Sequence, residues 1–158
     1  MHAETAEISW FTGPREDLRP MFELAEDSAL QLDAYLPLGR VLVAVVDGVV
    51  VGHLQLVDGD RSDVLELKSL AVVESFRGNG IGRALVERAV AECRSQASRT
   101  LMVSTAAAGT DNLRFYQRRG FRMLSVERDA FTASTGYPDP IDIDGIPLRD
   151  RVWLSMDL

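Results

Sequence analysis

The stretch Arg77-Gly78-Asn79-Gly80-Ile81-Gly82 most constrains what this chain can fold into. It lies between an apolar, β-branched run that ends near Val73 and a helix-like run that begins near Ile81. Glycines at alternate positions leave the loop without β-carbons, so its backbone N–H groups can approach a ligand closely. The following helix adds unpaired N–H groups and the positive end of its dipole, which favour a phosphate or pyrophosphate. The loop therefore predicts a phosphorylated cofactor.

Spacing argues against two other nucleotide-binding motifs. A Rossmann loop needs glycine at positions 78, 80 and 83, but Arg83 occupies the third position. A P-loop ends in Gly-Lys followed by Ser or Thr, and Ile81-Gly82-Arg83 does not supply that ending. The pattern that remains is Arg-x-x-Gly-x-Gly. Taken alone, it leaves open a connection that only turns the chain.

A second motif follows at residues 112–121, which read Asn-Leu-Arg-Phe-Tyr-Gln-Arg-Arg-Gly-Phe. In order and separation the two motifs resemble the signatures of the GNAT superfamily, the acetyl-coenzyme A-dependent N-acetyltransferases. The resemblance covers nearly the whole chain in element order and is specific across about residues 64–121. It implies an α/β fold: a mixed, mostly antiparallel sheet of about seven strands flanked by helices, with a β-α-β coenzyme A-binding unit.

Length and composition agree with one enzyme domain. With 158 residues, 46% of them hydrophobic, the chain can bury one sizeable core, so we expect residues 1–158 to form a single N-acetyltransferase domain. No apolar run is long enough to cross a bilayer, and Met1-His2-Ala3-Glu4 lacks the features of a secretory signal. We therefore expect a cytoplasmic protein with no membrane partner.

Hydrophobic periodicity predicts the order of the elements. Short alternating or β-branched runs predict strands at residues 7–11, 41–46, 49–57, 64–73, 101–104, 121–127 and 152–156. Apolar residues at helical spacing predict an amphipathic region over 18–29, a short helix that ends near Pro37, and helices over 81–96 and 111–119. Pro20 fits only a first turn or a kink, so the first region begins late or is broken in two.

Two connections in the first half have specific signals. Asp47-Gly48 tolerates positive φ and predicts a two-residue hairpin turn. The helix over 81–96 joins two strands, which predicts that strands 64–73 and 101–104 are parallel, with a right-handed crossover.

The second half carries weaker signals. Thr110 or Asp111 is the expected N-cap of the helix over 111–119, and Gly120 is expected to leave it through a left-handed conformation. Residues 130–149 contain several Gly and Pro residues and predict a long loop before the last strand.

The resemblance implies that the chain transfers an acetyl group from acetyl-coenzyme A to a primary amine by direct attack. Glu66 lies where many family members place the glutamate that deprotonates the amine. In a regular strand it would share one face with Lys68, Leu70 and Val72 until a bulge intervenes. A solvated acid, or one paired with Lys68, is the alternative interpretation.

Tyr116 is the candidate acid. Asn112 and Tyr116 lie four residues apart on one helix face, which the resemblance directs at the cofactor thiol and pantetheine arm. A phenol stays protonated at a pH where a thiol ionises, so it can donate to the departing sulfur. An aromatic side chain that only packs is the alternative.

The resemblance also assigns the cofactor to backbone groups around the first motif. Backbone N–H groups of the strand at Leu70, Ala71 and Val72 would bind pantetheine and polarise the acetyl carbonyl, without a polar side chain. The full set of expected cofactor-binding residues is Leu70, Ala71, Val72, Arg77, Gly78, Asn79, Gly80, Ile81, Gly82, Arg83, Asn112 and Tyr116.

The sequence gives weaker support for a functional role of the other candidate groups. His53 in an apolar strand is more often structural than a base. Cys93 is the only cysteine and falls inside a helical run, so we assign it packing alone. Two histidines and one thiol give no metal-ligand spacing, so we expect no metal.

The net charge of −7 opposes non-specific binding to nucleic acid and favours cationic partners. The expected partner is therefore an amine-bearing, small cationic molecule. The sequence leaves open a non-catalytic acyl-coenzyme A-binding module, a protein- or peptide-directed acetyltransferase, and a homodimer.

Overall fold

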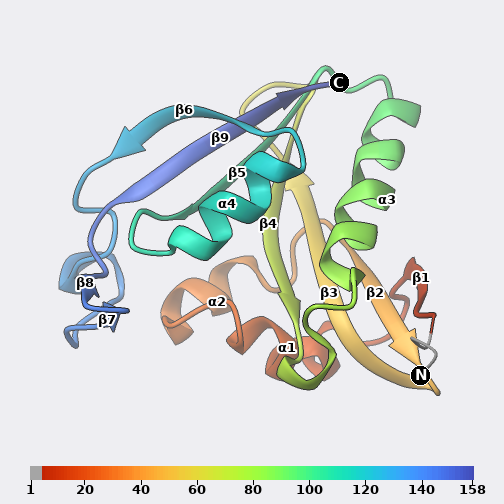
Figure 1. The fold of residues 1–158 in the computed structure, drawn as a ribbon, viewed down its shortest axis with the longest axis horizontal. Helices are drawn as coiled ribbons and strands as arrows, with labels where there is room; N and C mark the ends of the chain where they lie inside the picture. Colours follow the sequence, from red (N-terminus) through yellow and green to blue (C-terminus); the bar gives the residue numbers. More distant parts are fainter. Residues whose placement is uncertain (1–4) are drawn as a thin grey trace.

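The computed structural model describes residues 5–158 (Figure 1). Its strands are β1 (Glu7–Trp10), β2 (Arg40–Val46), β3 (Val49–Asp58), β4 (Val64–Val72), β5 (Thr100–Ala106), β6 (Arg122–Glu127), β7 (Asp142–Ile143), β8 (Ile146–Pro147) and β9 (Arg151–Asp157). Its α-helices are α1 (Arg19–Glu23), α2 (Ala29–Tyr35), α3 (Ile81–Ser95) and α4 (Thr110–Arg118). Three short 3-10 turns lie at Arg15–Leu18, Glu74–Phe76 and Ala133–Thr135.

One large sheet organises the described residues. Its seven strands follow the order β1-β2-β3-β4-β5-β9-β6. β4 and β5 pair in parallel across the α3 crossover, whereas the other neighbouring pairs are antiparallel. The mixed, mostly antiparallel sheet and the parallel β-α-β unit that the sequence predicts are confirmed.

The β2–β3 hairpin has the predicted turn. Asp47 and Gly48 have φ of 49° and 77°, and Val46 pairs with Val49 directly before and after them. Two consecutive residues with positive φ match the right-handed twist of the flanking strands, which explains the Asp-Gly sequence.

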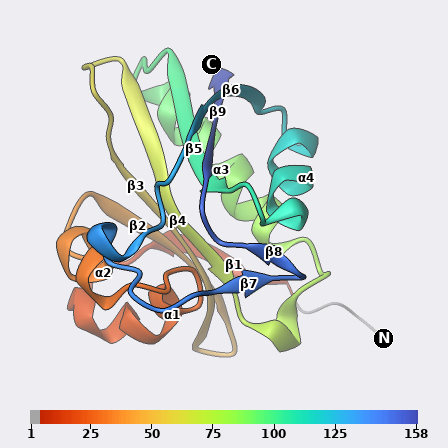
Figure 2. The same ribbon diagram turned by 90° about the vertical axis from the view of Figure 1, so that its left-hand side faces the viewer.

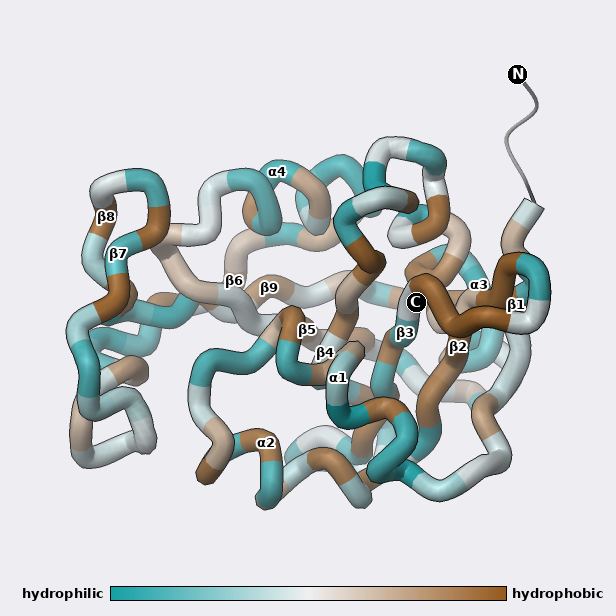
Figure 3. The backbone as a smooth tube through the Cα atoms, turned by 90° about the horizontal axis from the view of Figure 1, so that it is seen from below, coloured by the Kyte–Doolittle hydropathy of each residue, from teal (hydrophilic) through white to brown (hydrophobic). Residues whose placement is uncertain are grey.

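Strand alternation divides the side chains of the sheet between two cores. α3 and α4 cover one face, here called the α3/α4 face, where Leu54, Leu85 and Tyr116 are buried together. α1 and α2 cover the other, the α1/α2 face, where Phe22 packs with Val43. Figure 2 shows the two helix pairs on opposite sides of the sheet. In Figure 3, brown and teal segments alternate along α1 and α2, as expected of helices buried on one side.

The first helical region is broken, as Pro20 suggests. α1 begins at Arg19 with the proline in its first turn and ends after five residues. Ser28 then caps α2 by accepting a hydrogen bond of 3.2 Å from the backbone N–H of Gln31. Ala29 therefore belongs to α2 and not to the helix that carries Phe22.

The expected N-cap of α4 is wrong. Gly109 is the N-cap residue, no side chain caps the helix, and Thr110 is already helical. The chain turns out of β5 through a backbone hydrogen bond of 2.9 Å from Gly109 to Ala106, so the helix starts earlier than the side chains suggest. Gly120 has φ of 104°, and the predicted exit is confirmed.

The segment 130–149 has more structure than the predicted loop. It contains a 3-10 turn capped by Thr132 and the β7–β8 hairpin. Asp144 and Gly145 form the hairpin turn with φ of 50° and 84°. The same Asp-Gly signal that identified the first hairpin was present here, but strands of two residues carry too little periodicity to be recognised.

His53 is a core residue on the α1/α2 face. It is 0% exposed, its ring stacks on Phe22 with a centroid distance of 4.2 Å, and its Nε2 lies 2.8 Å from Ser69 Oγ. Burial lowers the pKa of His53 to about 3. The imidazole is therefore neutral at pH 7 and is enclosed in the core.

The lowered pKa makes stability depend on pH. An unfolded histidine titrates near pH 6.5, so between pH 6.5 and 3 the unfolded state binds a proton that the folded state does not. The stabilising contribution is complete above pH 6.5 and decreases as the pH falls towards 3. Urea unfolding should give a free energy about 2 kcal/mol lower at pH 5 than at pH 7 from this group alone. His53→Gln should lose that share of the pH dependence; an identical pH dependence in both proteins would contradict it.

Candidate active site

The site begins where β4 and β5 part. Their parallel pairing runs from Val64–Thr100 to Leu67–Val103 and then stops, although both strands continue. β5 stays paired with β9 as far as Ala106, and β4 stays paired with β3 as far as Val72. The β4 edge from residue 68 to residue 72 therefore faces a gap in the sheet, with no strand partner among the described residues. Unpaired backbone groups there are available to a ligand.

The glycine loop follows β4 directly and ends at the start of α3. Gly78 and Gly80 have φ of 81° and 80°, and a β-carbon built on either would meet no atom within 4 Å. These glycines are needed for their backbone conformation, not because the fold is crowded. Gly80 is the N-cap of α3 and no side chain caps the helix, so its first N–H groups are free to bind an anion.

Side chains of the loop hold its shape. The Arg77 Nε donates to the carbonyl oxygen of Val72 at 2.9 Å, and the Asn79 amide donates to the carbonyl oxygen of Phe76 at 3.2 Å. Arg83 pairs with Glu87 one turn along α3 at 2.9 Å. The structure thus brings the predicted loop residues together at one end of the gap.

α4 lies on the α3/α4 face beside the open part of β5. The Asn112 side chain lies 3.5 Å from Thr105 Oγ1, and a β-carbon on Gly82 of α3 would lie 3.4 Å from the Phe115 ring. Tyr116 packs edge-to-face against Phe121. Burial raises the pKa of the Tyr116 phenol, so the hydroxyl stays protonated at neutral pH. Its oxygen has no hydrogen-bond partner among residues 5–158.

Glu66 lies on the opposite face because of a bulge at Lys68. Gln55 pairs with Ser69, but the next residue of β3, Leu56, pairs with Leu67, so Lys68 is the extra residue. Glu66 therefore points to the α1/α2 side, while Leu70 and Val72 point to the α3/α4 side. The bulge that the sequence analysis allowed for intervenes directly after Glu66. The apolar residues change phase here, from 65 and 67 to 70 and 72, which is the signal that could have located it.

The environment of Glu66 suits a base. Its side chain is only 18% exposed, and its Oε2 lies 3.9 Å from Lys68 Nζ. Burial raises the pKa of Glu66, and the nearby positive charges of Lys68 and Arg151 limit the rise. A carboxylate in this position has a higher proton affinity than a solvated one, as suits a general base.

Glu66 and Tyr116 thus lie on opposite faces of the sheet, near the gap between β4 and β5. A reacting group held in the gap would be accessible to a base from one side and to an acid from the other. In the comparison with known proteins, residues 3–121 match the Acetyltransferase (GNAT) family. The chain belongs to this family.

Relatives match this acetyltransferase over most of its length. The N-acetyltransferase YvbK of Bacillus subtilis (strain 168) is 29% identical over 143 residues, which is 90% of each chain. The structure of an IAA acetyltransferase from Bacillus cereus ATCC 14579 has a TM-score of 0.88 at 32% identity, and the match covers 98% of this chain and 100% of that one. A GNAT acetyltransferase from Elizabethkingia anophelis with acetyl-CoA bound has a TM-score of 0.87 at 27% identity, over 99% and 100% of the two chains.

On the α1/α2 side of the acetyltransferase, three segments meet at one carboxylate. Glu26, between α1 and α2, accepts hydrogen bonds from Tyr35 Oη at 3.0 Å and from Tyr137 Oη at 2.6 Å. Lys68 Nζ lies 4.9 Å from the centre of the Tyr35 ring, so this cluster continues to Glu66. The sequence analysis did not identify this cluster, because nothing local connects Glu26 with the two tyrosines.

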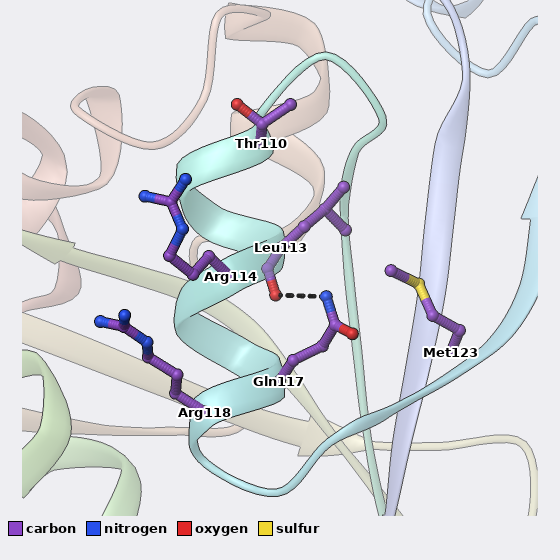
Figure 4. Close-up of a pocket in the computed structure, with 6 residues that line it drawn as sticks. All are labelled: Thr110, Leu113, Arg114, Gln117, Arg118 and Met123. Carbon is purple, nitrogen blue, oxygen red and sulfur yellow. Dashed lines mark hydrogen bonds between the residues drawn. The ribbon is translucent and has the colours of Figure 1, made fainter.

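A surface hollow of about 570 Å³ lies elsewhere, along the outer side of α4 (Figure 4). It is lined by Thr110, Leu113, Arg114, Gln117, Arg118 and Met123, none of which the sequence nominates for catalysis or cofactor binding. The Gln117 amide donates to the carbonyl oxygen of Leu113 at 3.2 Å within it. This hollow is separate from the gap between β4 and β5.

The remaining candidates have structural explanations. Cys93 is buried in α3, and burial raises the pKa of its thiol to about 11, which leaves it unreactive. Within residues 5–158, no three His, Cys, Asp or Glu side chains are grouped to hold a metal ion. The same part of the chain contains no helix that is both long and apolar enough to cross a membrane.

Proposed function

We propose that this acetyltransferase moves an acetyl group from acetyl-coenzyme A to the primary amine of a small molecule. The observation that carries the proposal is the open β4 edge between Glu66 and Tyr116, with the uncapped N-terminus of α3 at its end. The amine arrives as an ammonium ion, so the acceptor is cationic at its reacting end. The overall charge of −7 supports the attraction of such a cation.

The residues present fit the cofactor. Gly78, Gly80 and the first N–H groups of α3 form an anion site suited to the pyrophosphate. The unpaired β4 edge at Leu70, Ala71 and Val72 offers backbone groups to the pantetheine arm, and Asn112 lies across the gap beside β5. Acetyl-coenzyme A supplies the acetyl group as a thioester.

Two side chains, Glu66 and Tyr116, would then carry out the proton transfers. Glu66 takes one from the acceptor ammonium, so that the neutral nitrogen can form the new C–N bond. A backbone N–H group of the β4 edge donates to the carbonyl oxygen as it gains charge, without reorganisation. Tyr116 Oη would donate a proton to the sulfur as the C–S bond breaks. The new amide nitrogen loses its second proton to solvent at this stage, and solvent returns a proton to the phenol. The buried, un-ionised phenol and the partly buried carboxylate support these two assignments.

The glycine loop is tested by ligand-induced stabilisation. Acetyl-coenzyme A should raise the melting temperature of the wild type by mass action, and Gly80→Glu should abolish the rise because it adds negative charge where pyrophosphate binds. Gly145→Glu is the matched control, since it also introduces a side chain at positive φ with no atom within 4 Å. An undiminished shift in Gly80→Glu would remove the basis of the proposal.

Tyr116→Phe removes only a hydroxyl. We expect the acetyl-coenzyme A-induced melting shift to persist, whereas turnover should fall on the order of ten- to a thousandfold, the range of a general acid. The readout is single-turnover acetyl transfer, which isolates the chemical step. Wild-type rates in this variant would assign proton donation to another group.

Glu66→Gln should reduce kcat/KM most at neutral pH, because the variant cannot deprotonate the ammonium. Raising the pH should partly restore activity as free amine becomes available, and rate profiles from pH 6 to 10 measure this. Glu23→Gln, at an exposed glutamate of α1, is the control and should follow the wild type. A uniform loss at every pH would show that Glu66 orients the acceptor instead of deprotonating it.

A further inference from the structure

We propose that the amine acceptor also carries a carboxylate, which binds to Arg151 on the α1/α2 side of the sheet. This inference rests on the proposed acetyl transfer and narrows its substrate class to amino acids and related amino carboxylates. It replaces a purely cationic acceptor with a zwitterion, whose ammonium end faces Glu66 and whose anionic end faces the arginine.

Strand register places Arg151 on the same face as Glu66. Glu66 pairs with Met102 of β5, and Arg151 pairs with Ala106 four residues further along that strand. Residues an even number apart on a strand share a face, so both side chains project to the α1/α2 side. The positive charge of Arg151 also opposes the rise in the pKa of Glu66, in agreement with this placement.

Most of the hydrogen-bonding capacity of Arg151 is unused. Its side chain is only 25% exposed, yet its Nε and Nη2 have no hydrogen-bond partner among residues 5–158. Nη1 donates to Glu127 Oε2 at 3.3 Å, a long contact to a carboxylate that is 48% exposed. The other oxygen of Glu127 accepts from Trp153 Nε1 at 3.2 Å, so this acid does not engage the guanidinium bidentately. A half-exposed ion pair of this kind contributes little to stability.

Aromatic rings hold the guanidinium in one orientation. Its carbon lies 4.9 Å from the centre of the Phe131 ring and 5.9 Å from that of Trp153. Phe131 is itself fixed edge-to-face on Tyr137, whose hydroxyl binds Glu26. The segment 130–149 therefore positions Arg151 beside the acceptor side of the sheet. A planar guanidinium held against aromatic rings is suited to bidentate recognition of a planar anion.

The neighbouring charges favour a monoanion. Glu66 and Glu127 both lie near Arg151, and two acids would repel a doubly charged phosphate more strongly than a carboxylate. The acidic side chains near this surface are not all free to bind a second ammonium group. Glu26 is occupied by Tyr35 and Tyr137, and Lys68 adds a second positive charge next to Glu66.

The test compares amino carboxylates with the amines that remain when the carboxylate is removed. The pairs are phenylalanine with phenethylamine, γ-aminobutyrate with propylamine, and ε-aminocaproate with pentylamine, so the spacing between the two groups varies. For at least one pair, the wild type should show a kcat/KM on the order of ten- to a hundredfold higher for the carboxylate member. Arg151→Gln should remove that preference. Arg151→Lys should retain only part of it, because lysine lacks the planar guanidinium that binds both carboxylate oxygens.

Arg122→Gln is the matched control. Arg122 is an exposed arginine paired with Ser155, four residues along β9 from Arg151, which is about 13 Å. It should keep the wild-type preference. Equal use of both members of every pair by the wild type, or a preserved preference in Arg151→Gln, would overturn the inference.

A binding measurement separates this inference from the proposed function. Calorimetry with hydrocinnamate and hexanoate, which carry the carboxylate but no amine, should show binding to the coenzyme A-bound wild type and at least tenfold weaker binding to Arg151→Gln. Acetylation of no amine would contradict the proposed function, while Arg151-dependent binding of these acids would still support the carboxylate site. Equal or absent binding in both proteins would refute the site, whether or not amines are acetylated.

Discussion

The parting of β4 and β5 beyond Leu67 and Val103 is the constraint on which the rest of the structure depends. Each strand keeps its outer neighbour, β3 for β4 and β9 for β5, so the sheet opens without losing its framework. The cost is a row of backbone groups without strand partners, which buried chains rarely tolerate. A long polar ligand that followed the strand edge would satisfy them, and the pantetheine arm of coenzyme A has that form.

The bulge at Lys68 determines how the gap can be used. Without it, Glu66 would share the α3/α4 face with Leu70 and Val72, on the same side as Tyr116. The extra residue turns Glu66 to the opposite face, so the proposed base and the proposed acid lie on different faces of the sheet. One residue of local irregularity thus separates these two candidate groups.

The sequence predicted the parts of the fold that depend on the conformational preferences of neighbouring residues. The Asp47-Gly48 turn, the glycine loop and the parallel β-α-β unit each follow from the conformational preferences of a few adjacent residues or from the length of one crossover. The sequence did not predict the α1/α2 side, because this side is assembled from distant segments. The hydrogen bond between Glu26 and Tyr137, for example, joins residues 111 positions apart. No periodicity or turn signal encodes such a contact, and only the packed fold brings the two residues together.

Net charge and local charge also differ in what they predict. A net charge of −7 favours cationic partners on the scale of the whole surface, but many of these acids are exposed and far from the gap. Around Glu66 the positive charges of Lys68 and Arg151 oppose the rise in its pKa that burial causes. The same two cations would oppose a second ammonium group on the acceptor. The long-range field therefore favours approach of an amine, while the local charges favour an acceptor whose remaining charge is negative.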